Sequence, residues 1–393
     1  MGNEVFQKAK GLMEYVMKLR RQIHQNPELG LKEYETAALI KQELESYGVE
    51  VVPISAETGV LGILRGEKEG GNTVTAFRAD IDALPILEQT GLPYASKNTG
   101  VMHACGHDGH TAILLGTAKL LSSMRDRFSG TVKFIFQPGE ETLFGAKEMV
   151  KAGVLENPDV DIIVALHAWP FIETGKIGIW PGPYQASGDK FSVKIYGGGG
   201  HGAYPHKSKD PLLAANHAVI ALQSIVSRQI NAIDSTVLSV CTFHAGNAFN
   251  VIPEEVEFTG TVRCHNKEVR NSMEKRMEKI LKGIVEAFDC NYELDYQYGV
   301  PMVVNNPEVL DLLAEAATQA IGENSVETLP GPVMGSEDFS LYLEKVPGAF
   351  VRLGNTNPGE EEISVHNDRF NFNDDAIPYG MSTLTQFVLN KNI

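Results

Sequence analysis

Short apolar runs alternate with longer helical patterns over residues 1–170, and this alternation restricts the fold more than any other feature of the chain. The strand-like runs are rich in β-branched and aromatic residues, whereas the segments between them repeat with the helical period. The strand-like runs cover residues 59–64, 73–77, 131–136 and 161–168, and the helical patterns cover residues 5–25, 32–47, 110–124 and 144–152. Such alternation predicts an α/β fold in which helices flank a mostly parallel central sheet.

The pattern changes after Pro181-Gly182-Pro183 and becomes strand, helix, two strands, helix and strand, which is typical of the ferredoxin-like fold. The expected strands cover residues 190–196, 237–243, 255–264 and 292–298, and the expected helices cover 210–230 and 268–288. A strand at 349–353 and a helix from Asp374 then return to the first pattern. The 393 residues are too many for one ordinary core, so we expect a large domain of residues 1–186 and 299–393 with an inserted domain of residues 187–298.

The composition is that of a globular protein and argues against two classes of partner. With a net charge of −16, the chain would be repelled by nucleic acids and by anionic membranes. Its four cysteines include no C-x-x-C pair, which predicts a reducing compartment and no disulfide framework. Because it also has no signal-peptide pattern and no apolar run long enough to span a bilayer, we expect a soluble cytoplasmic protein.

The segment Met102–His110 is the densest group of metal-binding side chains in the chain, with three histidines, one cysteine and one aspartate. Thiolate, imidazole and carboxylate are the side chains that bind zinc and related divalent ions. A loop rich in histidine at the start of a helix is the alternative if no further ligands lie nearby. The segment therefore predicts a metal site only in combination with other parts of the chain.

Further polar side chains occur where predicted strands end, at Asp80, Glu140-Glu141 and His167, and His366 lies in a late polar loop. Open α/β sheets bind ligands beyond the carboxyl ends of their strands, so these side chains are expected to converge. Adjacent glutamates point in different directions, so one can bind a metal while the other moves a proton. Asp80 could orient a ligand histidine or could cap a turn, and His167 could equally be a buried core histidine.

A dinucleotide-binding oxidoreductase is a remote alternative, because Gly197–Gly202 contains a G-x-G-x-x-G motif after a predicted strand. Pro205 interrupts the helix that should follow, and the acidic residue expected about twenty positions later is absent from residues 221–224. The motifs of serine hydrolases (G-x-S-x-G) and of single-metal zincins (H-E-x-x-H) do not occur in the sequence.

The ordered motifs CGHDGH, QPGEE, HAWP, GGHGAYPH, NVIP, GSEDFS and SVHNDRF resemble the M20 metallopeptidase family over nearly the whole chain. The chain most resembles the branch of N-acyl-amino-acid amidohydrolases, hippurate hydrolases and auxin-conjugate hydrolases. The resemblance implies two divalent ions per subunit, which could be zinc, manganese, cobalt or nickel. It also implies that Cys105 lies between the two ions. The ligands that it implies are Cys105, His107, Glu141, His167 and His366.

The same resemblance implies a hydrolase that cleaves the amide bond of N-acyl amino acids, as deacetylases and aminoacylases do. Glu140 would activate the bridging water, and His201 would stabilise the oxyanion in the site of a neighbouring subunit. The inserted domain would be a lid and would join a homodimer. Asn250 and Arg263 could bind the substrate carboxylate, although Arg263 could also be a surface strand residue. Activity as a metallo-carboxypeptidase or dipeptidase on short peptides is the main alternative.

Overall fold

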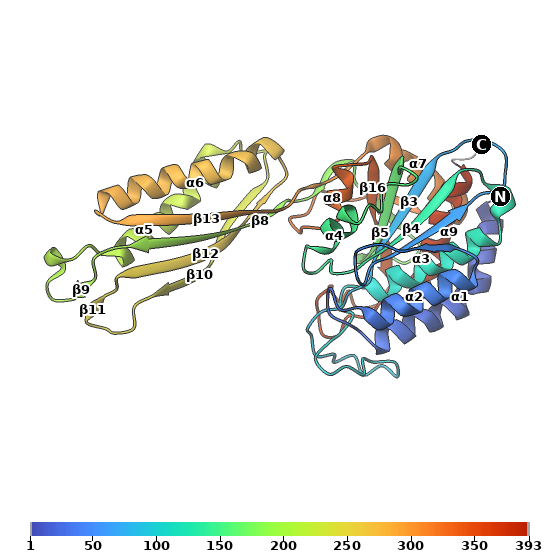
Figure 1. The fold of residues 1–393 in the computed structure, drawn as a ribbon, viewed down its shortest axis with the longest axis horizontal. Coiled ribbons are helices and arrows are strands. Elements are labelled where there is room, and N and C mark those ends of the chain that lie inside the picture. The colour runs from blue at the N-terminus through green and yellow to red at the C-terminus, as the bar shows by residue number, and fades with distance from the viewer. Residues whose placement is uncertain (1, 391–393) are drawn as a thin grey trace. The chain divides into compact units, whose positions relative to one another are not determined.

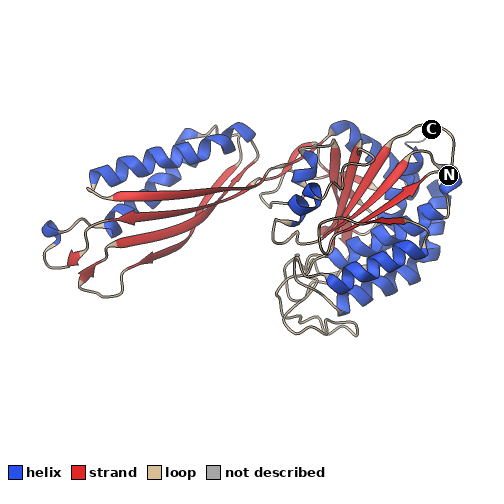
Figure 2. Cartoon of the chain, viewed as in Figure 1, coloured by secondary structure: helices blue, strands red, loops and turns tan. Residues whose placement is uncertain are grey.

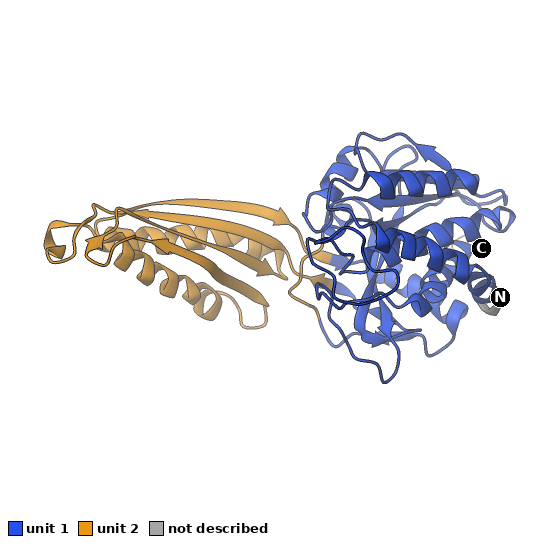
Figure 3. Cartoon of the chain, turned by 90° about the horizontal axis from the view of Figure 1, so that it is seen from below, with its two compact units in different colours: residues 1–182, 304–331, 338–393 blue, residues 183–303, 332–337 orange. Residues whose placement is uncertain are grey.

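The computed structural model describes residues 2–390, and the chain divides into two compact units (Figure 3). Unit 1 comprises Met1–Gly182, Val304–Gly331 and Asp338–Ile393. Unit 2 comprises Pro183–Val303 and the short segment Pro332–Glu337. The chain leaves unit 1 through β7 (Gly182–Gln185) and returns to it through β14 (Val303–Asn305). No helix among residues 2–390 is long and apolar enough to cross a membrane.

Unit 1 is built on an eight-stranded sheet with flanking helices, as expected for an α/β fold (Figures 1 and 2). Its strand order is β1 (Glu50–Val52), β2 (Val60–Arg65), β4 (Thr131–Gln137), β3 (Val74–Asp80), β5 (Ile162–Glu173), β16 (Gly348–Thr356), β6 (Ile177–Ile179) and β15 (Val326–Thr328). The four central strands, from β4 to β16, run parallel, whereas β2 and β6 pair antiparallel to their inner neighbours. The carboxyl ends of β3, β4 and β5 therefore lie at one edge, where a site can form.

The helices of unit 1 bury apolar residues against the sheet or against one another. They are α1 (Gly2–Gln25), α2 (Tyr34–Ser46), α3 (His107–Ser122), α4 (Gly145–Lys151), α7 (Pro307–Ile321), α8 (Ser340–Leu343) and α9 (Ile377–Asn390), with 3-10 turns at Arg125–Arg127 and Asp374–Ala376. In α1, Val5, Ala9 and Val16 lie on one face and are fully buried. Helices α1, α3 and α9 pack against one another, and α3 also contacts β3 and β5. This packing holds the start of α3 near the strand ends.

Unit 2 is an antiparallel sheet of order β10 (Thr236–Ala245), β12 (Glu255–Cys264), β8 (Gly188–Tyr196) and β13 (Asn291–Val300). Helices α5 (Pro211–Ser224), continued by a π turn at Ile225–Gln229, and α6 (Lys267–Ala287) lie together on one side of it (Figure 2). Asp210 caps α5 and Asn266 caps α6, each accepting two backbone N–H groups. A short two-stranded antiparallel sheet of β9 (Gly200–His201) and β11 (Val251–Ile252) and a 3-10 turn at Pro205–Lys207 complete the unit.

Several element boundaries differ from the sequence pattern, and two of them have a local reason. Strand β5 continues to Glu173 instead of ending at Ala168, so His167 lies within a strand. The ladder passes Pro170, which has no N–H, because the pairing with β16 is irregular between Gly354 and Thr356. Helix α2 begins at Tyr34 and not at residue 32, since Glu33 has a ψ of 51°, which is incompatible with a helix.

Candidate metal centre

Three elements of unit 1 bring candidate ligand atoms together at the carboxyl ends of the central strands. Cys105 and His107 flank Gly106, whose φ of 90° allows the chain to turn directly into α3. His167 comes from β5, and the turn after β4 supplies Glu140 and Glu141. Ligand atoms of Cys105, His107 and His167 lie within 4.8 Å of one another, and all three residues are buried.

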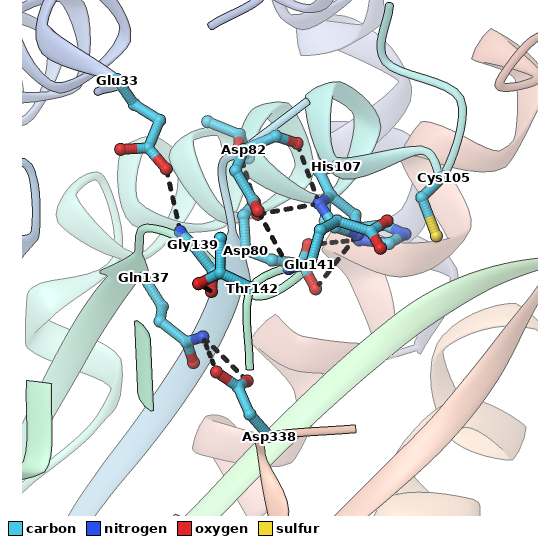
Figure 4. Close-up of polar contacts among 12 residues, drawn as sticks. Glu33, Asp80, Asp82, Cys105, His107, Gln137, Gly139, Glu141, Thr142 and Asp338 are labelled. Carbon is cyan, nitrogen blue, oxygen red and sulfur yellow. Dashed lines mark hydrogen bonds and ion pairs between the residues drawn. The ribbon is translucent and has the colours of Figure 1, made fainter. Parts of the chain in front are cut away.

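A second group of three includes Cys105 again, now with Glu141 and His366, and its ligand atoms also lie within 4.8 Å of one another. The two groups together contain all five side chains named as ligands by the sequence motifs, and they share only the Cys105 thiol. Figure 4 shows Cys105, His107 and Glu141 side by side at this position. A donor atom shared by two such groups is an arrangement that can hold two neighbouring cations, and a thiolate suits borderline and soft ions.

Both buried histidines are oriented so that one ring nitrogen remains available. Nδ1 of His107 lies 3.0 Å from the backbone oxygen of Asp82, and Nδ1 of His167 lies 2.7 Å from the backbone oxygen of Ala168. A carbonyl oxygen only accepts, so Nδ1 carries the hydrogen in each ring, and in the neutral ring that binds a metal the lone pair is on Nε2. Nε2 of His167 lies 3.4 Å from Sγ of Cys105, and Nε2 of His107 has no hydrogen bond within residues 2–390. This donor set fits a divalent cation.

Glu141 and His366 approach each other from distant segments. Oε1 of Glu141 receives no hydrogen bond from the described residues and lies 3.1 Å from Nε2 of His366. His366 has a positive φ of 63°, and its N–H donates to the Ala104 oxygen at 2.7 Å, so the loop is tied to the segment before Cys105. Half of the His366 side chain is exposed, whereas Glu141 is largely covered. His366 is thus the side chain of this group that faces solvent.

Glu140 occupies the same turn as Glu141 but is more deeply buried, with 7% of the residue exposed. Its carboxylate lies within 4.8 Å of candidate atoms of His107 and Glu141. A carboxylate so close to a cation site can accept a proton from water and return it to a leaving group. The turn therefore presents two carboxylates to the same small volume.

The electrostatics of the cluster favour an added cation. Burial raises the pKa of the Cys105 thiol to about 12, with Glu141 adding to the increase. Burial also disfavours the charged form of His107, but Asp80 and Cys105 outweigh this effect and hold the pKa of His107 well above its ordinary value. Burial and the nearby His110 hold the pKa of His167 well below its ordinary value. A divalent ion would stabilise the thiolate that the protein environment alone disfavours.

Asp80 lies beside this cluster and contacts a histidine outside it. Its carboxylate accepts hydrogen bonds from Nδ1 of His110 and from the Arg78 guanidinium, both at 2.6 Å, and lies 3.8 Å from Nε2 of His107. Burial opposes its charge, but His107, Arg78 and His110 hold the pKa of Asp80 well below its ordinary value. Nε2 of His110 accepts the Ala168 N–H at 2.8 Å, so Asp80 supports the strand that carries His167.

Two buried residues that contact the cluster or its supports were not identified from the sequence. Asp82 accepts the Glu141 N–H at 3.0 Å and also faces Nδ1 of His107 (Figure 4). It follows β3 two residues after Asp80, so the strand-end argument applied to Asp80 could have found it. Arg78 bridges Asp80 to Asp338, at 2.6 and 3.0 Å, and no local pattern indicated this contact because Asp338 is 260 residues away.

The three other candidate residues lie in unit 2. His201, in β9, is paired with Val251 of β11, and the backbone oxygen of Asn250 accepts the Gly202 N–H at 2.8 Å, so His201 and Asn250 lie together at one exposed two-stranded sheet. Arg263 is near the opposite end of the long strand β12 and donates to the Val262 oxygen at 3.1 Å, so unit 2 does not bring it to that small sheet. The glycines before His201 lead into β9 and not into a helix, which excludes the dinucleotide-binding arrangement.

Comparison with known proteins gives one consistent result. The model of the peptidase family M20/M25/M40 matches residues 76–390. The chain is 41% identical to the hippurate hydrolase of Campylobacter jejuni over 95% of both chains. It is 42% identical to the N-acetylcysteine deacetylase of Bacillus subtilis, over 92% of this chain and 93% of that protein.

The same likeness extends to a solved structure. The fold matches that of the B. subtilis YXEP protein, a dinuclear metal-binding peptidase of the M20 family, with a TM-score of 0.85 and 36% identity over 98% of this chain and 100% of that one. A family match over most of the chain and relatives of this identity agree with a cluster of cysteine, histidine and glutamate at the strand ends. The chain belongs to the peptidase family M20/M25/M40.

Proposed function

We propose that this protein is a metal-dependent amidohydrolase that cleaves the amide bond of N-acyl amino acids, as a deacetylase or aminoacylase does. The observation that carries the proposal is the pair of donor groups that share Cys105, with the Glu140 carboxylate directly beside them. A hippurate hydrolase and an N-acetylcysteine deacetylase among the relatives support this substrate class.

In this proposal, the five side chains of the shared groups would hold two divalent ions, and Cys105 is the side chain that belongs to both groups. The ligands are Cys105, His107, Glu141, His167 and His366. When bound, such ions acidify water and polarise a carbonyl oxygen. Zinc, manganese, cobalt and nickel all accept imidazole, thiolate and carboxylate ligands, so the metal that supports activity has to be identified by testing each one.

Glu140 is the proposed acid and base. Its buried carboxylate would accept the proton of the attacking water and deliver it to the departing amino group. His201 is proposed to donate a hydrogen bond to the oxyanion in the site of a neighbouring subunit. Nδ1 of His201 accepts the Ala203 N–H at 3.1 Å, so the hydrogen of the neutral ring is on Nε2, where it can be donated.

Unit 2 is proposed to be a ferredoxin-like lid that joins two subunits of a homodimer. Its strand order places β10 at an edge of the sheet, and the residues after Val240 in this strand are exposed. Apolar side chains at Ile220, Phe243 and Phe249 are exposed in the same unit, which supports an interface. Asn250 and Arg263 are proposed to bind the substrate carboxylate; the exposed Asn250 is open to a ligand.

Hydrolysis of short peptides is the second candidate, because the M20 structure with 36% identity is of a peptidase. One experiment separates the two functions. Chelated protein is reloaded with zinc, manganese, cobalt or nickel and incubated with N-acetyl amino acids, N-benzoyl amino acids and dipeptides. We expect release of free amino acid from the acylated substrates with at least one metal. Turnover of dipeptides alone would favour the peptidase, and no turnover with any metal would contradict both.

A further inference from the structure

Glu33 is a fully buried carboxylate that joins three separate segments of unit 1. Its Oε1 accepts the N–H of Leu31 at 2.9 Å and the N–H of Gly139 at 2.8 Å. Its Oε2 accepts the hydroxyl of Thr58 at 2.7 Å. Figure 4 shows the Glu33 side chain reaching the Gly139 amide from outside the metal cluster. The residue therefore links the segment before α2, the segment before β2 and the turn after β4.

Among residues 2–390, the hydrogen-bond partners of the Glu33 carboxylate are two amides and a hydroxyl, and they include no cation. Burial raises the pKa of Glu33 above its ordinary value, while the Thr58 and Gly139 contacts oppose the increase. Burying a carboxylate without a cationic partner lowers the free energy of unfolding. An apolar side chain of similar size would make the folded protein more stable, so the hydrogen bonds of Glu33 require another explanation.

The turn that Glu33 contacts is closely packed against the segment before α2. Gly139 has a φ of 59°, and a Cβ atom there would lie 2.7 Å from Leu31. A Cβ atom on Gly30 would lie 2.8 Å from Thr142 and 3.2 Å from Gly139. The Thr142 hydroxyl also donates to the Gly139 oxygen at 2.7 Å, which closes the turn. Neither segment can shift without moving the other.

Glu140 lies between two backbone amides that carboxylates hold. The Gly139 amide on one side is bound by Glu33 at 2.8 Å, and the Glu141 amide on the other is bound by Asp82 at 3.0 Å. The Gly139 oxygen, which belongs to the peptide unit directly before Glu140, accepts the Thr142 hydroxyl at 2.7 Å, so this unit is held within the same turn. The two carboxylates and Thr142 thus restrain the backbone from which the Glu140 side chain starts.

We infer that Glu33 is a positioning residue, which holds the turn of Gly139–Glu141 so that the Glu140 carboxylate faces the metal cluster. The inference rests on the proposed role of Glu140 as acid and base. A displacement of about 1 Å of a catalytic group can lower the rate about 100-fold, which is why a buried anchor of this kind is useful. Glu33 itself does not touch the substrate.

The test compares Glu33→Ala with Glu33→Gln and with a matched control. A glutamine can keep all three contacts, because its oxygen accepts both amides and its NH2 group donates to the Thr58 oxygen. Glu28→Ala is the control, since the Glu28 carboxylate accepts the Glu35 and Thr36 amides at 3.1 and 2.9 Å and so holds the start of α2 instead of the turn.

The first measurement is amide hydrogen exchange of peptides covering residues 137–145, in protein without metal. We expect faster exchange in Glu33→Ala and exchange like that of the unmodified protein in Glu33→Gln and Glu28→Ala. Unchanged exchange in Glu33→Ala, or equal acceleration in Glu28→Ala, would overturn the inference. If Glu33→Ala does not fold, Thr58→Val removes one contact of the carboxylate and is expected to accelerate exchange in the same peptides, and unchanged exchange there would overturn it.

The second measurement is turnover of an N-acyl amino acid by the metal-loaded variants. We expect kcat to fall about 10- to 100-fold in Glu33→Ala with KM changed less than about threefold, and Glu33→Gln to restore most of kcat. A kcat as low in Glu33→Gln as in Glu33→Ala would contradict positioning through hydrogen bonds. If the unmodified protein hydrolyses no amide, the proposed function fails, and the exchange measurement still decides whether Glu33 holds the turn.

Discussion

Nδ1 of His107 lies 3.0 Å from the backbone oxygen of Asp82, so the orientation of a candidate metal ligand is fixed by the residue that follows strand β3. The carboxylate of Asp82 is directed at the same nitrogen, at 3.2 Å, and also accepts the Glu141 amide. One residue therefore holds both the imidazole and the turn that carries the glutamates. Such supporting contacts determine which ring nitrogen faces the metal and how strongly it binds.

Replacing Asp82 with alanine should weaken metal binding about 10- to 100-fold, because the Glu141 amide and the His107 ring lose a common anchor. Asp82→Asn keeps an oxygen that can accept the Glu141 amide, so its effect should be smaller. Metal affinity is measured by competition with a chelator of known affinity. Equal affinities for Asp82→Ala and the unmodified protein would show that the carboxylate has no supporting role.

Glu140→Gln should leave metal content unchanged and lower kcat by roughly 10²- to 10⁴-fold, since the amide cannot accept and return a proton. The buried position of Glu140 is preserved by the isosteric side chain, so folding is not expected to change. Metal content by elemental analysis and turnover are measured on the same preparation. A variant that lost a metal ion would instead indicate that Glu140 is a ligand, as its distance of at most 4.8 Å from His107 and Glu141 atoms permits.

Cys105→Ser should lower the metal content below two ions per subunit, because Cys105 is the only side chain common to both donor groups. A hydroxyl is a poorer ligand than a thiolate for borderline and soft ions. Cys264→Ser is the control, as Cys264 is also buried but lies in unit 2. Retention of both ions in Cys105→Ser, at the affinity of the control, would exclude the shared sulfur.

The large sheet and its helices were predictable because strand and helix periods are local properties of the sequence, and the α/β prediction is confirmed. Their positions after predicted strands likewise predicted that Asp80 and Glu141 lie at the same end of the sheet, although their contacts could not be predicted. The continuation of β5 past Pro170 was not predictable, because it depends on an irregular pairing with β16. Local sequence patterns predict the element on which a side chain lies, but not the residues that it contacts.

The residues that hold the site in place show the same limit of prediction from local sequence. Glu33 and Arg78 read as ordinary charged residues in the sequence, yet their partners Gly139 and Asp338 are 106 and 260 residues away. Nothing in the spacing of these residues indicates that their charged groups are buried. His366 was found through its motif, whereas its positive φ and its tie to Ala104 are visible only in the fold.

Arg78→Met should destabilise the protein by about 3–5 kcal/mol, because Asp80 and Asp338 would both lose the buried guanidinium that contacts them. Arg65→Met is the control, since the Arg65–Glu50 pair is more than half exposed and should contribute less than about 1 kcal/mol. Urea unfolding of the metal-free proteins gives both free energies. Similar values for the two variants would mean that the buried network does not depend on Arg78.

Glu88 should contribute stability that is lost in acid. Burial opposes its charge, but the His24 ring, the Thr90 hydroxyl and the Ser96 amide outweigh it and lower the pKa of Glu88 to about 2 from 4.5. Because the folded pKa lies below the unfolded one, the stabilisation is fully present above about pH 4.5 and disappears as the pH falls toward 2.

Glu88→Gln removes this titration. In the unmodified protein the Ser96 amide donates to Oε2 of Glu88 at 2.6 Å, and the glutamine keeps an oxygen that can accept it. Between pH 5 and 3, the unfolding free energy of the unmodified protein should therefore fall by about 1–2 kcal/mol more than that of the variant. Asp108 and His24 are present in both proteins, so the difference between the two curves reports Glu88 together with its contact to His24. Urea unfolding at several pH values measures it, and parallel curves would mean that Glu88 has the same pKa in the folded and unfolded chain.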